Sequence, residues 1–372
     1  MSGTPRLAPL SIALVTPSFP PQIGGIEVFT SRLADELARL GCAVDVLTQW
    51  RRSDAPVPAV QRLASGVTVR WFRSRTRSDR FPVAPGLARH LLAGSGHYDV
   101  VHAHNFHSSP PLLAALSTTK PLVISPYYHR VGHTAAARLL HRAYDKPAAR
   151  IFDRADAIVC CSNSEASLVG TDYATNTAKI SVVYPGVDQE VIAGATPHPT
   201  DRPVALMAGR LNEYKHIDIA IRAVAALHRD IDLVIIGEGP ERDSLAELAR
   251  ETGGPGRVRF LGRVTDDDLK RWLRTASVVL SLSSHESFGL ILLEGAAAGA
   301  SLVASDIPAH REVATLTGNA IHLVPVGSDP ATVTRAIEMC LDSSADRSIR
   351  RINLPSWADT AAGGLEVYRS IV

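Results

Sequence analysis

Short runs of β-branched and other apolar residues alternate with helix-like patterns along nearly the whole chain, and this alternation limits the folds available to it. The first run, "SIALVTP" (11–17), is followed by "IEVFTSRLADELARLG" (26–41), in which apolar residues recur at helical spacing before a glycine. Further strands are predicted at 43–48, 67–72, 99–104, 121–128, 156–162 and 180–186. Such alternation is typical of a parallel sheet covered by helices on both faces.

A polar, proline-containing stretch, 188–203, interrupts the alternation and is predicted to be a linker. Strands then resume at 204–209, 232–239, 258–262, 277–283, 301–305 and 320–326. The sequence thus predicts an α/β fold of two tandem doubly wound, Rossmann-like domains, 1–187 and 204–355. The tail, 356–372, is expected to be an amphipathic helix, and its return onto the first domain is one expectation. A chain of 372 residues also favours two domains over one core.

Ligands of doubly wound folds bind at the carboxyl ends of the strands, where loops lead into helix N-termini. With two such domains, a deep cleft between them is the expected location of a binding site. The residues that follow the predicted strands are therefore the first candidates for a functional role.

Charge and cysteine content restrict the partners and the compartment. The formal net charge is +2, but residues 51–80 hold eight arginines and two aspartates, a local excess of six positive charges. Such a segment suits phosphate or an anionic membrane surface, and a solvated loop is an equal alternative.

The four cysteines show no metal-ligand spacing, which is typical of a reduced cytosolic protein. No secretory signal and no apolar stretch of ~18 residues is evident, so we expect a cytoplasmic protein, at most peripheral on the inner face of the membrane.

The stretch "SSHESFGLILLEGAAAGA" (283–300) carries two glutamates among small or apolar residues. Glu286 falls in the loop after the strand predicted at 277–283, and Glu294 lies inside a helix expected to begin near Gly289. Backbone N–H groups at a helix start favour a phosphate. A carboxylate beside an anion site needs other partners, such as the hydroxyls of a sugar. The alternative is that both glutamates lie on the solvated side of an amphipathic helix.

Two more strand ends carry candidate residues. "GRLNEYKH" places Arg210 and Lys215 after the strand at 204–209, where two cations suit a diphosphate. "PSFPPQIGGIEVF" places Gly24 and Gly25 in the first strand-to-helix loop, where paired glycines allow close approach of the backbone to a ligand. Solvated helix-flanking charges and a plain tight turn are the respective alternatives.

Taken together and in order, these motifs resemble the retaining family-4 glycosyltransferases of the GT-B fold, over nearly the whole chain. The resemblance includes "DVVHAHN", "ADAIVCCSNSE", "VVYPGVD", "AGRLNEYKHIDIAIRAV", "VIIGEGPERDSL" and "HESFGLILLEGAAAGASLVASDIPAHREV". It implies the transfer of one hexose-type sugar, with retention of anomeric configuration, from a nucleotide diphosphate sugar to an acceptor hydroxyl. The nucleotide sugar is then a co-substrate, and no separate cofactor is expected.

The resemblance also implies roles for individual residues. Glu286 would hydrogen-bond the transferred sugar, and Glu294 would hold the ribose hydroxyls. Arg210 and Lys215 would bind the diphosphate and stabilise charge on the departing nucleotide. The resemblance further implies that the loop Ser287, Phe288, Gly289 and Leu290 completes the anion site and that Val264 lies in the turn beside the base. It also implies that Gly24 and Gly25 close over the donor and that His129 lies near the sugar.

Several competing patterns were weighed against this resemblance. "HAHNFH" (102–107) has the spacing of binuclear metallohydrolases, but a phenylalanine stands where that pattern expects aspartate. "TDDDLKRW" (265–272) imitates a metal-binding Asp-x-Asp motif and is predicted to be a helix start instead. "GEGPERD" (237–243) lacks the third glycine of a dinucleotide fingerprint. "VISPYYHR" departs from the family's usual strand-then-histidine pattern, so Tyr127 or Tyr128 is an alternative to the histidine.

The sequence leaves the substrates open. UDP-sugars and GDP-mannose are both candidate donors, and the acceptor is a glycan, lipid or small molecule bound by the first domain. Helix-like residues at 133–152 add Arg138, Arg142 and Arg150 to the basic segment, which indicates an anionic membrane surface or a phosphorylated acceptor, with a solvated surface as the alternative. Nucleic acid is not expected as a partner, and no metal site is expected. A catalytically inactive scaffold that binds sugar nucleotides is the alternative function.

Overall fold

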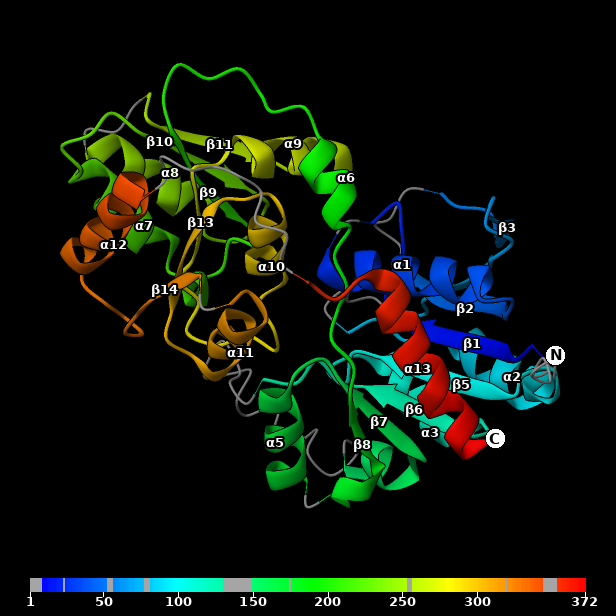
Figure 1. Cartoon of the computed structure of the whole chain (residues 1–372). Helices are drawn as coiled ribbons and strands as arrows, with labels where there is room; N and C mark the ends of the chain where they lie inside the picture. The colour runs from blue at the N-terminus through cyan, green and yellow to red at the C-terminus, as the bar shows by residue number, and fades with distance from the viewer. Residues whose placement is uncertain are drawn as a thin grey trace, which may run out of the picture. The chain divides into compact units, whose positions relative to one another are not determined.

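The structure, a computed structural model, describes residues 9–22, 24–51, 56–76, 81–129, 149–173, 175–252, 256–318, 320–343 and 353–372. The chain forms two compact units (Figure 1). Unit 1 comprises Met1–Pro185 and Trp357–Val372, and unit 2 comprises Gly186–Ser356. The chain therefore leaves unit 1 once and returns to it with its last helix.

Among the described residues, unit 1 contains an eight-stranded sheet with the order β3–β4–β2–β1–β5–β6–β7–β8. Its strands are β1 (Ser11–Thr16), β2 (Ala43–Trp50), β3 (Val60–Arg62), β4 (Thr68–Arg73), β5 (Val100–His104), β6 (Leu122–Ser125), β7 (Ala157–Cys160) and β8 (Ile180–Val182). Neighbouring strands are parallel, except that β3 pairs antiparallel with β4. Strand β3 was not predicted, because its three exposed residues carry no apolar pattern.

Helices cover both faces of this sheet. They are α1 (Gly25–Arg39), α2 (Pro85–Gly94), α3 (Ser109–Ser117), a helix over 149–154, α5 (Asn163–Asp172) and α13 (Trp357–Ile371), with short turns of 3-10 helix at Ser95–His97 and Thr177–Lys179. Alternate residues of β1 point to opposite faces. Ile12 and Leu14 pack in a cluster with residues of α1 and α13, whereas Ala13 and Val15 pack in a second cluster with residues of α2 and α3. The continuous apolar strands of the sequence are thus buried on both sides.

Unit 2 contains, among the described residues, a six-stranded parallel sheet with the order β11–β10–β9–β12–β13–β14. Its strands are β9 (Val204–Ala208), β10 (Asp232–Ile236), β11 (Val258–Gly262), β12 (Val278–Ser281), β13 (Ser301–Ser305) and β14 (Ile321–Val324). Its helices are α6 (Gln189–Gly194), the 3-10 helix η3 (Glu213–Lys215), α7 (Ile217–Ala225), α8 (Arg242–Glu251), α9 (Asp266–Thr275), α10 (Leu290–Ala297), α11 (Pro308–Leu316) and α12 (Pro330–Ser343).

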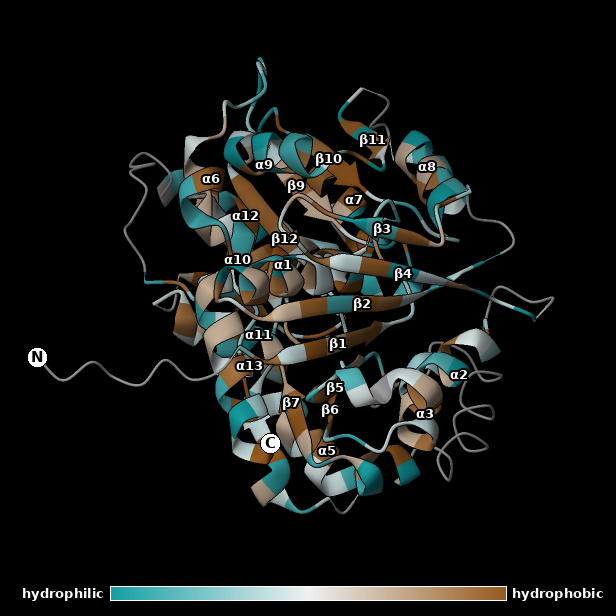
Figure 2. Ribbon diagram, turned by 90° about the vertical axis from the view of Figure 1, so that its right-hand side faces the viewer, coloured by the Kyte–Doolittle hydropathy of each residue, from teal (hydrophilic) through white to brown (hydrophobic). Residues whose placement is uncertain are grey.

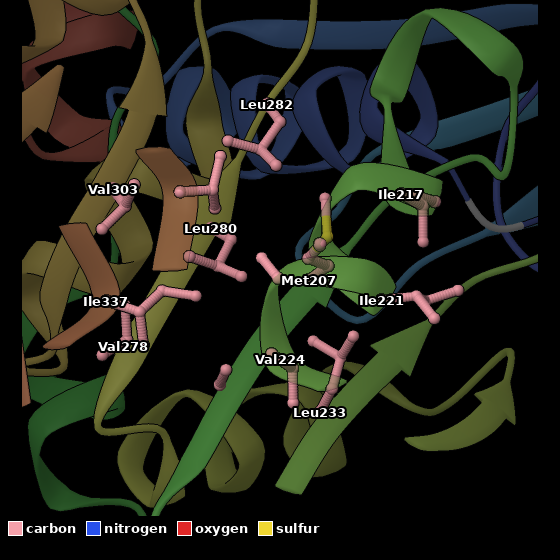
Figure 3. Packing of buried hydrophobic residues seen from close by; sticks show 14 of the residues in the cluster. Met207, Ile217, Ile221, Val224, Leu233, Val278, Leu280, Leu282, Val303 and Ile337 are labelled. Atoms are coloured by element: carbon pink, nitrogen blue, oxygen red, sulfur yellow. The ribbon is translucent and has the colours of Figure 1, made fainter. Parts of the chain in front are cut away.

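The core of unit 2 forms where α7 and α12 meet the sheet. Figure 3 shows Met207, Leu233 and Leu280 of the strands together with Ile221 of α7 and Ile337 of α12. All five side chains are at most 5% exposed. Figure 2 shows the strands of both units largely in brown, the colour of hydrophobic residues. Burial of this apolar surface supplies the main driving force for folding.

The segment 188–203 differs from the predicted linker, because it belongs to unit 2 and contains helix α6. Helix α6 packs against α9 and α10. Beyond it, the His198 ring stacks on Trp272 at 4.2 Å between centroids, and its Nε2 lies 2.9 Å from Asp268 Oδ1. The polar, proline-containing sequence suggested a linker, but the contacts of α6 and of His198 hold segment 188–203 against unit 2.

The strand order reverses once in each sheet, and the reversals locate the places where ligands bind in such folds. In unit 1, β1 and β5 are neighbours, and the strands that follow each of them in the chain are added on opposite sides of this pair. In unit 2, β9 and β12 form the corresponding pair. The loops after β1, β9 and β12 carry Gly24, Lys215 and Glu286, respectively. The topology therefore places these sequence candidates at the reversal points of their own sheets.

Candidate active site

A pocket lies in unit 2 at the carboxyl ends of β9, β10 and β12. Its polar lining includes Arg210 and Lys215 from the segment after β9, Ser281 at the end of β12 and Ser283 in the loop after it. The rest of the wall is apolar and comes from the strands, such as Ile235, from the loop after β9 and from Ile217 of α7. The pocket thus gathers both predicted cations at the point where the strand order reverses.

Glu286 binds Lys215 directly beside this pocket. Lys215 Nζ lies 2.8 Å from Glu286 Oε1, and the hydroxyls of Ser283 and Ser281 donate to the same oxygen at 2.7 and 3.2 Å. The Lys215 and Glu286 side chains are 18% and 15% exposed. Both residues were expected in the site, but their pairing with each other was not.

The ionisation of both groups follows from their proximity. Burial by itself would raise the pKa of Glu286, but the charge of Lys215 and hydrogen bonds hold it well below its usual range. Burial would likewise lower the pKa of Lys215, but the charge of Glu286 raises it. Both side chains are therefore charged at neutral pH, and each stabilises the other in a largely buried setting.

The two loops that carry this pair are also joined by their neighbours. The backbone N–H of Ser284 donates to the Tyr214 carbonyl at 2.9 Å, and the Tyr214 and His285 rings stack with centroids 4.4 Å apart. Lys215 Nζ lies 5.2 Å from the centre of the Tyr214 ring. The loop after β9 and the loop after β12 thus form one structural element.

The glycines of "GEGPERD" hold the Arg210 loop close to β10. A Cβ at Gly237 would lie 1.9 Å from the Gly209 carbonyl oxygen, and one at Gly239 would lie 2.2 Å from that of Leu211. Any larger side chain would push the loop after β9 away. Sequence reasoning rejected these glycines as a dinucleotide fingerprint and missed this packing role, which only the neighbouring backbone reveals.

Helix α10 begins beside Glu286 and contains Glu294. Its N-cap is Gly289, with φ 113°, a conformation that favours glycine, so the N-cap residue has no side chain to cap the helix. Glu294 is half-buried within the helix. Gly295 packs against the sheet, because a Cβ there would lie 2.8 Å from Leu302 Cδ2. The absence of a side chain at Gly295 thus lets α10 lie close to the sheet.

The other predicted residues of this helix start and of the base turn lie as follows. Ser287 and Leu290 are half-buried, and Phe288 is 4% exposed. Val264 is half-buried in the loop between β11 and α9 and does not line the described pocket. The structure therefore brings the "SFGL" residues to the Glu286 loop, while Val264 stands apart from the pocket in the same unit.

Gly24, Gly25 and His129 lie in unit 1. A Cβ at Gly24 would lie 2.4 Å from Glu27 Oε2, whose carboxylate accepts a hydrogen bond from Ser18. At Gly25, a Cβ would have no described neighbour within 4 Å. His129 is half-buried beyond the end of β6. Gly24 thus makes room for a neighbouring carboxylate, whereas Gly25 borders open space.

The tyrosines proposed as alternatives to His129 have internal partners. The Tyr127 hydroxyl lies 3.0 Å from His104 Nδ1, and the Tyr128 hydroxyl donates to Asp172 at 2.9 Å. The backbone N–H of Tyr128 donates to Glu165, which is 1% exposed. These contacts make both tyrosines part of the unit 1 core.

The competing metal motifs have structural explanations. The His102 ring is buried between Tyr368 of α13, at 2.7 Å, and Ser125 of β6, at 2.9 Å. In "TDDDLKRW", the Thr265 hydroxyl accepts from the backbone N–H of Asp268 and caps α9, as predicted. Within the described ranges, no group of three His, Cys, Asp or Glu side chains is arranged to hold a metal ion.

The basic segment is only partly described. Arg52, Arg77, Arg80, Arg138 and Arg142 lie outside the described residues. Of the others, Arg70 pairs with Asp45 at 2.8 Å and Arg73 lies over the Trp50 ring at 5.6 Å. Part of the local charge is therefore already neutralised within unit 1. No helix in the described part of the chain is long and apolar enough to cross a membrane.

Comparisons with protein families match both halves of the chain. Residues 23–191 match the family described as "Glycosyltransferase Family 4", and residues 188–353 match "Glycosyl transferases group 1". The two matches meet close to the boundary between the units.

Individual relatives cover most of the chain. A protein from Nocardioides sp. named D-inositol 3-phosphate glycosyltransferase is 31% identical over 93% of this chain and 85% of its own length. Its namesake from Kineococcus radiotolerans is 31% identical over 94% of this chain and 91% of its own length.

Solved structures share the fold at low identity. Sucrose-phosphate synthase from Thermosynechococcus elongatus superposes with a TM-score of 0.73 at 20% identity, covering 97% of this chain and 94% of its own. Anabaena HepE in complex with UDP-glucose gives a TM-score of 0.72 at 17% identity, covering 97% and 98%. Together with the family matches, these likenesses show that the chain belongs to the family-4-type glycosyltransferases of the GT-B fold.

Proposed function

We propose that the chain is a retaining glycosyltransferase that moves a hexose-type sugar from a nucleotide diphosphate sugar to an acceptor hydroxyl. The observation that carries the proposal is that Arg210 and Lys215 line one pocket at the reversal point of the unit 2 sheet, and that Glu286 pairs with Lys215 beside it. Two cations and a charged carboxylate match a ligand that joins a diphosphate to a polyhydroxylated ring.

The reaction breaks the bond between the anomeric carbon and a diphosphate oxygen, and the diphosphate leaves with the bonding electrons. The acceptor oxygen forms the new bond to the anomeric carbon, and its proton passes to the departing diphosphate oxygen. Lys215 and Arg210 would stabilise the negative charge that develops on the leaving diphosphate. Glu286 would accept hydrogen bonds from the sugar, and Glu294 from the ribose.

The start of α10, Ser287–Leu290, would complete the diphosphate site, because a helix N-terminus favours negative charge. Gly289 supports this role because it places no side chain over the helix end. The roles of Gly24, Gly25, His129 and Val264 remain predictions from the family resemblance. The open space beside Gly25 is compatible with an approaching ligand.

We propose that no catalytic metal takes part. Glu286 is held by a cation and two hydroxyls, and Asp266 pairs with Lys270 at 2.7 Å on α9. Lys215 and Arg210 offer the positive charge that a divalent ion would otherwise bring to the diphosphate. Enzyme treated with EDTA should keep most of its turnover. Loss that manganese or zinc restores would contradict this proposal.

A panel of donors tests the proposed function. Thermal unfolding should shift upward with the correct nucleotide sugar, because a ligand that binds the folded state stabilises it by mass action. UDP-glucose, other UDP-sugars and GDP-mannose form the panel, and donor hydrolysis is the second readout. D-inositol 3-phosphate belongs among the tested acceptors because the curated relatives carry its name. Binding without hydrolysis or transfer would favour an inactive scaffold.

We also propose a cytoplasmic enzyme that contacts an anionic membrane surface or a phosphorylated acceptor through unit 1. Arg62 and Arg75 are exposed there and support the proposal. Co-sedimentation with anionic vesicles should exceed that with neutral vesicles and fade as salt rises from ~0.15 to ~0.5 M. Equal sedimentation at low salt would contradict membrane contact.

A further inference from the structure

His310 lies behind the Glu286 loop and is fully buried, although the family motifs assign it no role. It is the third residue of α11, which follows β13. Its Nδ1 lies 2.8 Å from the Ser305 carbonyl oxygen at the end of that strand. A carbonyl oxygen can only accept, so Nδ1 carries a proton and donates it to Ser305.

The opposite edge of the ring faces the active-site loop. Nε2 lies 3.4 Å from the Ser281 hydroxyl and 3.9 Å from Glu286 Oε1. The Ser281 hydroxyl is itself 3.2 Å from Glu286 Oε1, so the ring nitrogen, the hydroxyl and the carboxylate oxygen all lie within 4 Å of one another. With Nδ1 anchored to Ser305, the ring cannot rotate away from Ser281 without losing its own hydrogen bond.

The same ring supports the start of α10. A Cβ at Gly289 would lie 3.0 Å from His310 Cδ2 and 3.5 Å from its Nε2, so the ring edge lies against the Gly289 backbone. Ser305 adds a second tie, because its hydroxyl donates to the carbonyl of Ser283. His310 and Ser305 together therefore contact both ends of the loop from Ser283 to Gly289.

The two oxygens of Glu286 are used differently. Lys215, Ser283 and Ser281 all donate to Oε1, whereas no described residue hydrogen-bonds Oε2. Three hydrogen bonds to Oε1 fix the orientation of the carboxylate group, and they therefore also fix the direction in which Oε2 points. Oε2 is then the oxygen available to a sugar hydroxyl.

We propose that His310 is a positioning residue for Glu286: it fixes the Ser281 hydroxyl and the Gly289 backbone, and thereby aims Glu286 Oε2 at the sugar. The inference rests on the proposed role of Glu286 in binding the transferred sugar. A displacement of a reacting group by about 1 Å can cost on the order of 100-fold in rate, so a residue that touches no substrate still affects turnover.

Two substitutions separate positioning from a purely structural role. In His310→Asn, the amide nitrogen replaces Nδ1 and keeps the Ser305 contact, but the edge that faces Ser281 is lost. In His310→Gln, the terminal amide reaches the place of Nε2 and restores the polar contact to Ser281. Exposed His228 lies elsewhere in unit 2, and His228→Asn is the matched control.

Steady-state kinetics with the donor that the wild type turns over provide the first readout. His310→Asn should lower kcat about tenfold or more, with donor KM and UDP or GDP affinity within about threefold of wild type. His310→Gln should recover most of that loss, and His228→Asn should match wild type. Equal kcat for His310→Asn and His228→Asn, or equal losses for the Asn and Gln variants, would overturn the proposal.

Thermal unfolding gives a readout that does not depend on activity. Glu286→Gln and His310→Asn are made singly and together, and the double variant should lose less Tm than the sum of the single losses, because the two residues share Ser281. Strictly additive losses would overturn the proposal. If the wild type turns over no nucleotide sugar, the proposed function fails, and the Tm cycle still decides whether His310 and Glu286 are coupled.

Discussion

Glu165 in unit 1 is buried and Glu286 in unit 2 is largely buried, both near the carboxyl ends of strands, but the partners of the two carboxylates differ. Glu165 accepts from the backbone N–H groups of Tyr128 and Cys161. Burial raises its pKa to about 7, although these hydrogen bonds oppose the shift. Glu286 has the largely buried cation Lys215 beside it, and the pKa of Glu286 lies well below the usual range.

The contrast shows that the pKa of a carboxylate with little exposed surface depends on whether a cation lies beside it. Backbone N–H groups alone do not keep Glu165 fully charged, and its contacts connect the loop after β6 to α5. Lys215, which lines the pocket, keeps Glu286 charged beside it. A neighbouring counter-charge, rather than burial itself, accounts for the different pKa directions of the two carboxylates.

The largest expected effect tests the Glu286 side of this comparison. Glu286→Ala should lower turnover by about 100-fold or more, because it removes a contact to the transferred sugar. Glu247 is an exposed glutamate on α8, and Glu247→Ala should turn over substrate like the wild type. Near-normal turnover of Glu286→Ala would refute the assigned role.

The next effect concerns His104, a buried histidine of unit 1, and the dependence of the free energy of unfolding on pH. Burial lowers the pKa of His104 from 6.5 to about 3, so the unfolded chain binds a proton below pH 6.5 that the folded chain excludes. Stability contributed by neutral His104 is therefore present above pH 6.5 and is lost as the pH falls. At pH 5 this loss amounts to about 2 kcal/mol.

Urea unfolding at pH 8 and pH 5 measures this loss against a variant that does not titrate. His104→Asn keeps a polar atom near the Tyr127 hydroxyl and should lose less stability than the wild type between the two pH values. Identical losses for both proteins would show that His104 does not contribute to the acid sensitivity of unit 1.

Removing the cations of unit 2 should have a smaller effect on binding. Lys215→Ala or Arg210→Ala should weaken UDP or GDP binding about tenfold and lower turnover with it, since each removes a charged contact to the diphosphate. Uridine or guanosine should bind as before, and Arg222→Ala, exposed on α7, serves as the control. An equal loss for nucleoside and nucleotide would indicate misfolding instead.

The smallest effect tests whether Glu286 and the diphosphate compete for Lys215. Glu286→Gln removes the negative charge 2.8 Å from Lys215 Nζ, so the cation becomes fully available to a diphosphate. UDP or GDP should bind about threefold more tightly, while turnover falls. Isothermal titration measures the affinity, and tenfold weaker binding would show that the ion pair helps to build the diphosphate site.

Much of the fold was predictable because buried parallel strands have a distinctive sequence pattern. The strand predictions at 43–48 and 258–262, for example, correspond to β2 and β11. Strand β3 and helix α6 were missed because each is short and carries a weak apolar pattern. The assignment of 188–203 to unit 2 depends on the contact of His198 with Trp272, which lies far away in the sequence.

The candidate site was predictable only where a residue follows a strand directly. Arg210 and Glu286 lie in the loops after β9 and β12, as expected from strand ends. Ser281 and Ser283 also end a strand and could have been proposed from "SLSSHES" by the same argument. His310 could not have been proposed in this way, because its position near the start of an amphipathic helix does not indicate which residues it contacts in the folded chain.

The sequence by itself determined the two parallel α/β units and the chemical types of residue at their strand ends, because periodicity and strand-end position are local properties. The tertiary structure decided that Lys215 pairs with Glu286, that Ser281 and His310 lie beside that carboxylate, and that no cation of the described residues pairs with Glu165. These relations join loops after different strands of a sheet. They depend on which strands are neighbours and on how closely glycines let their loops approach, and both follow from packing in three dimensions.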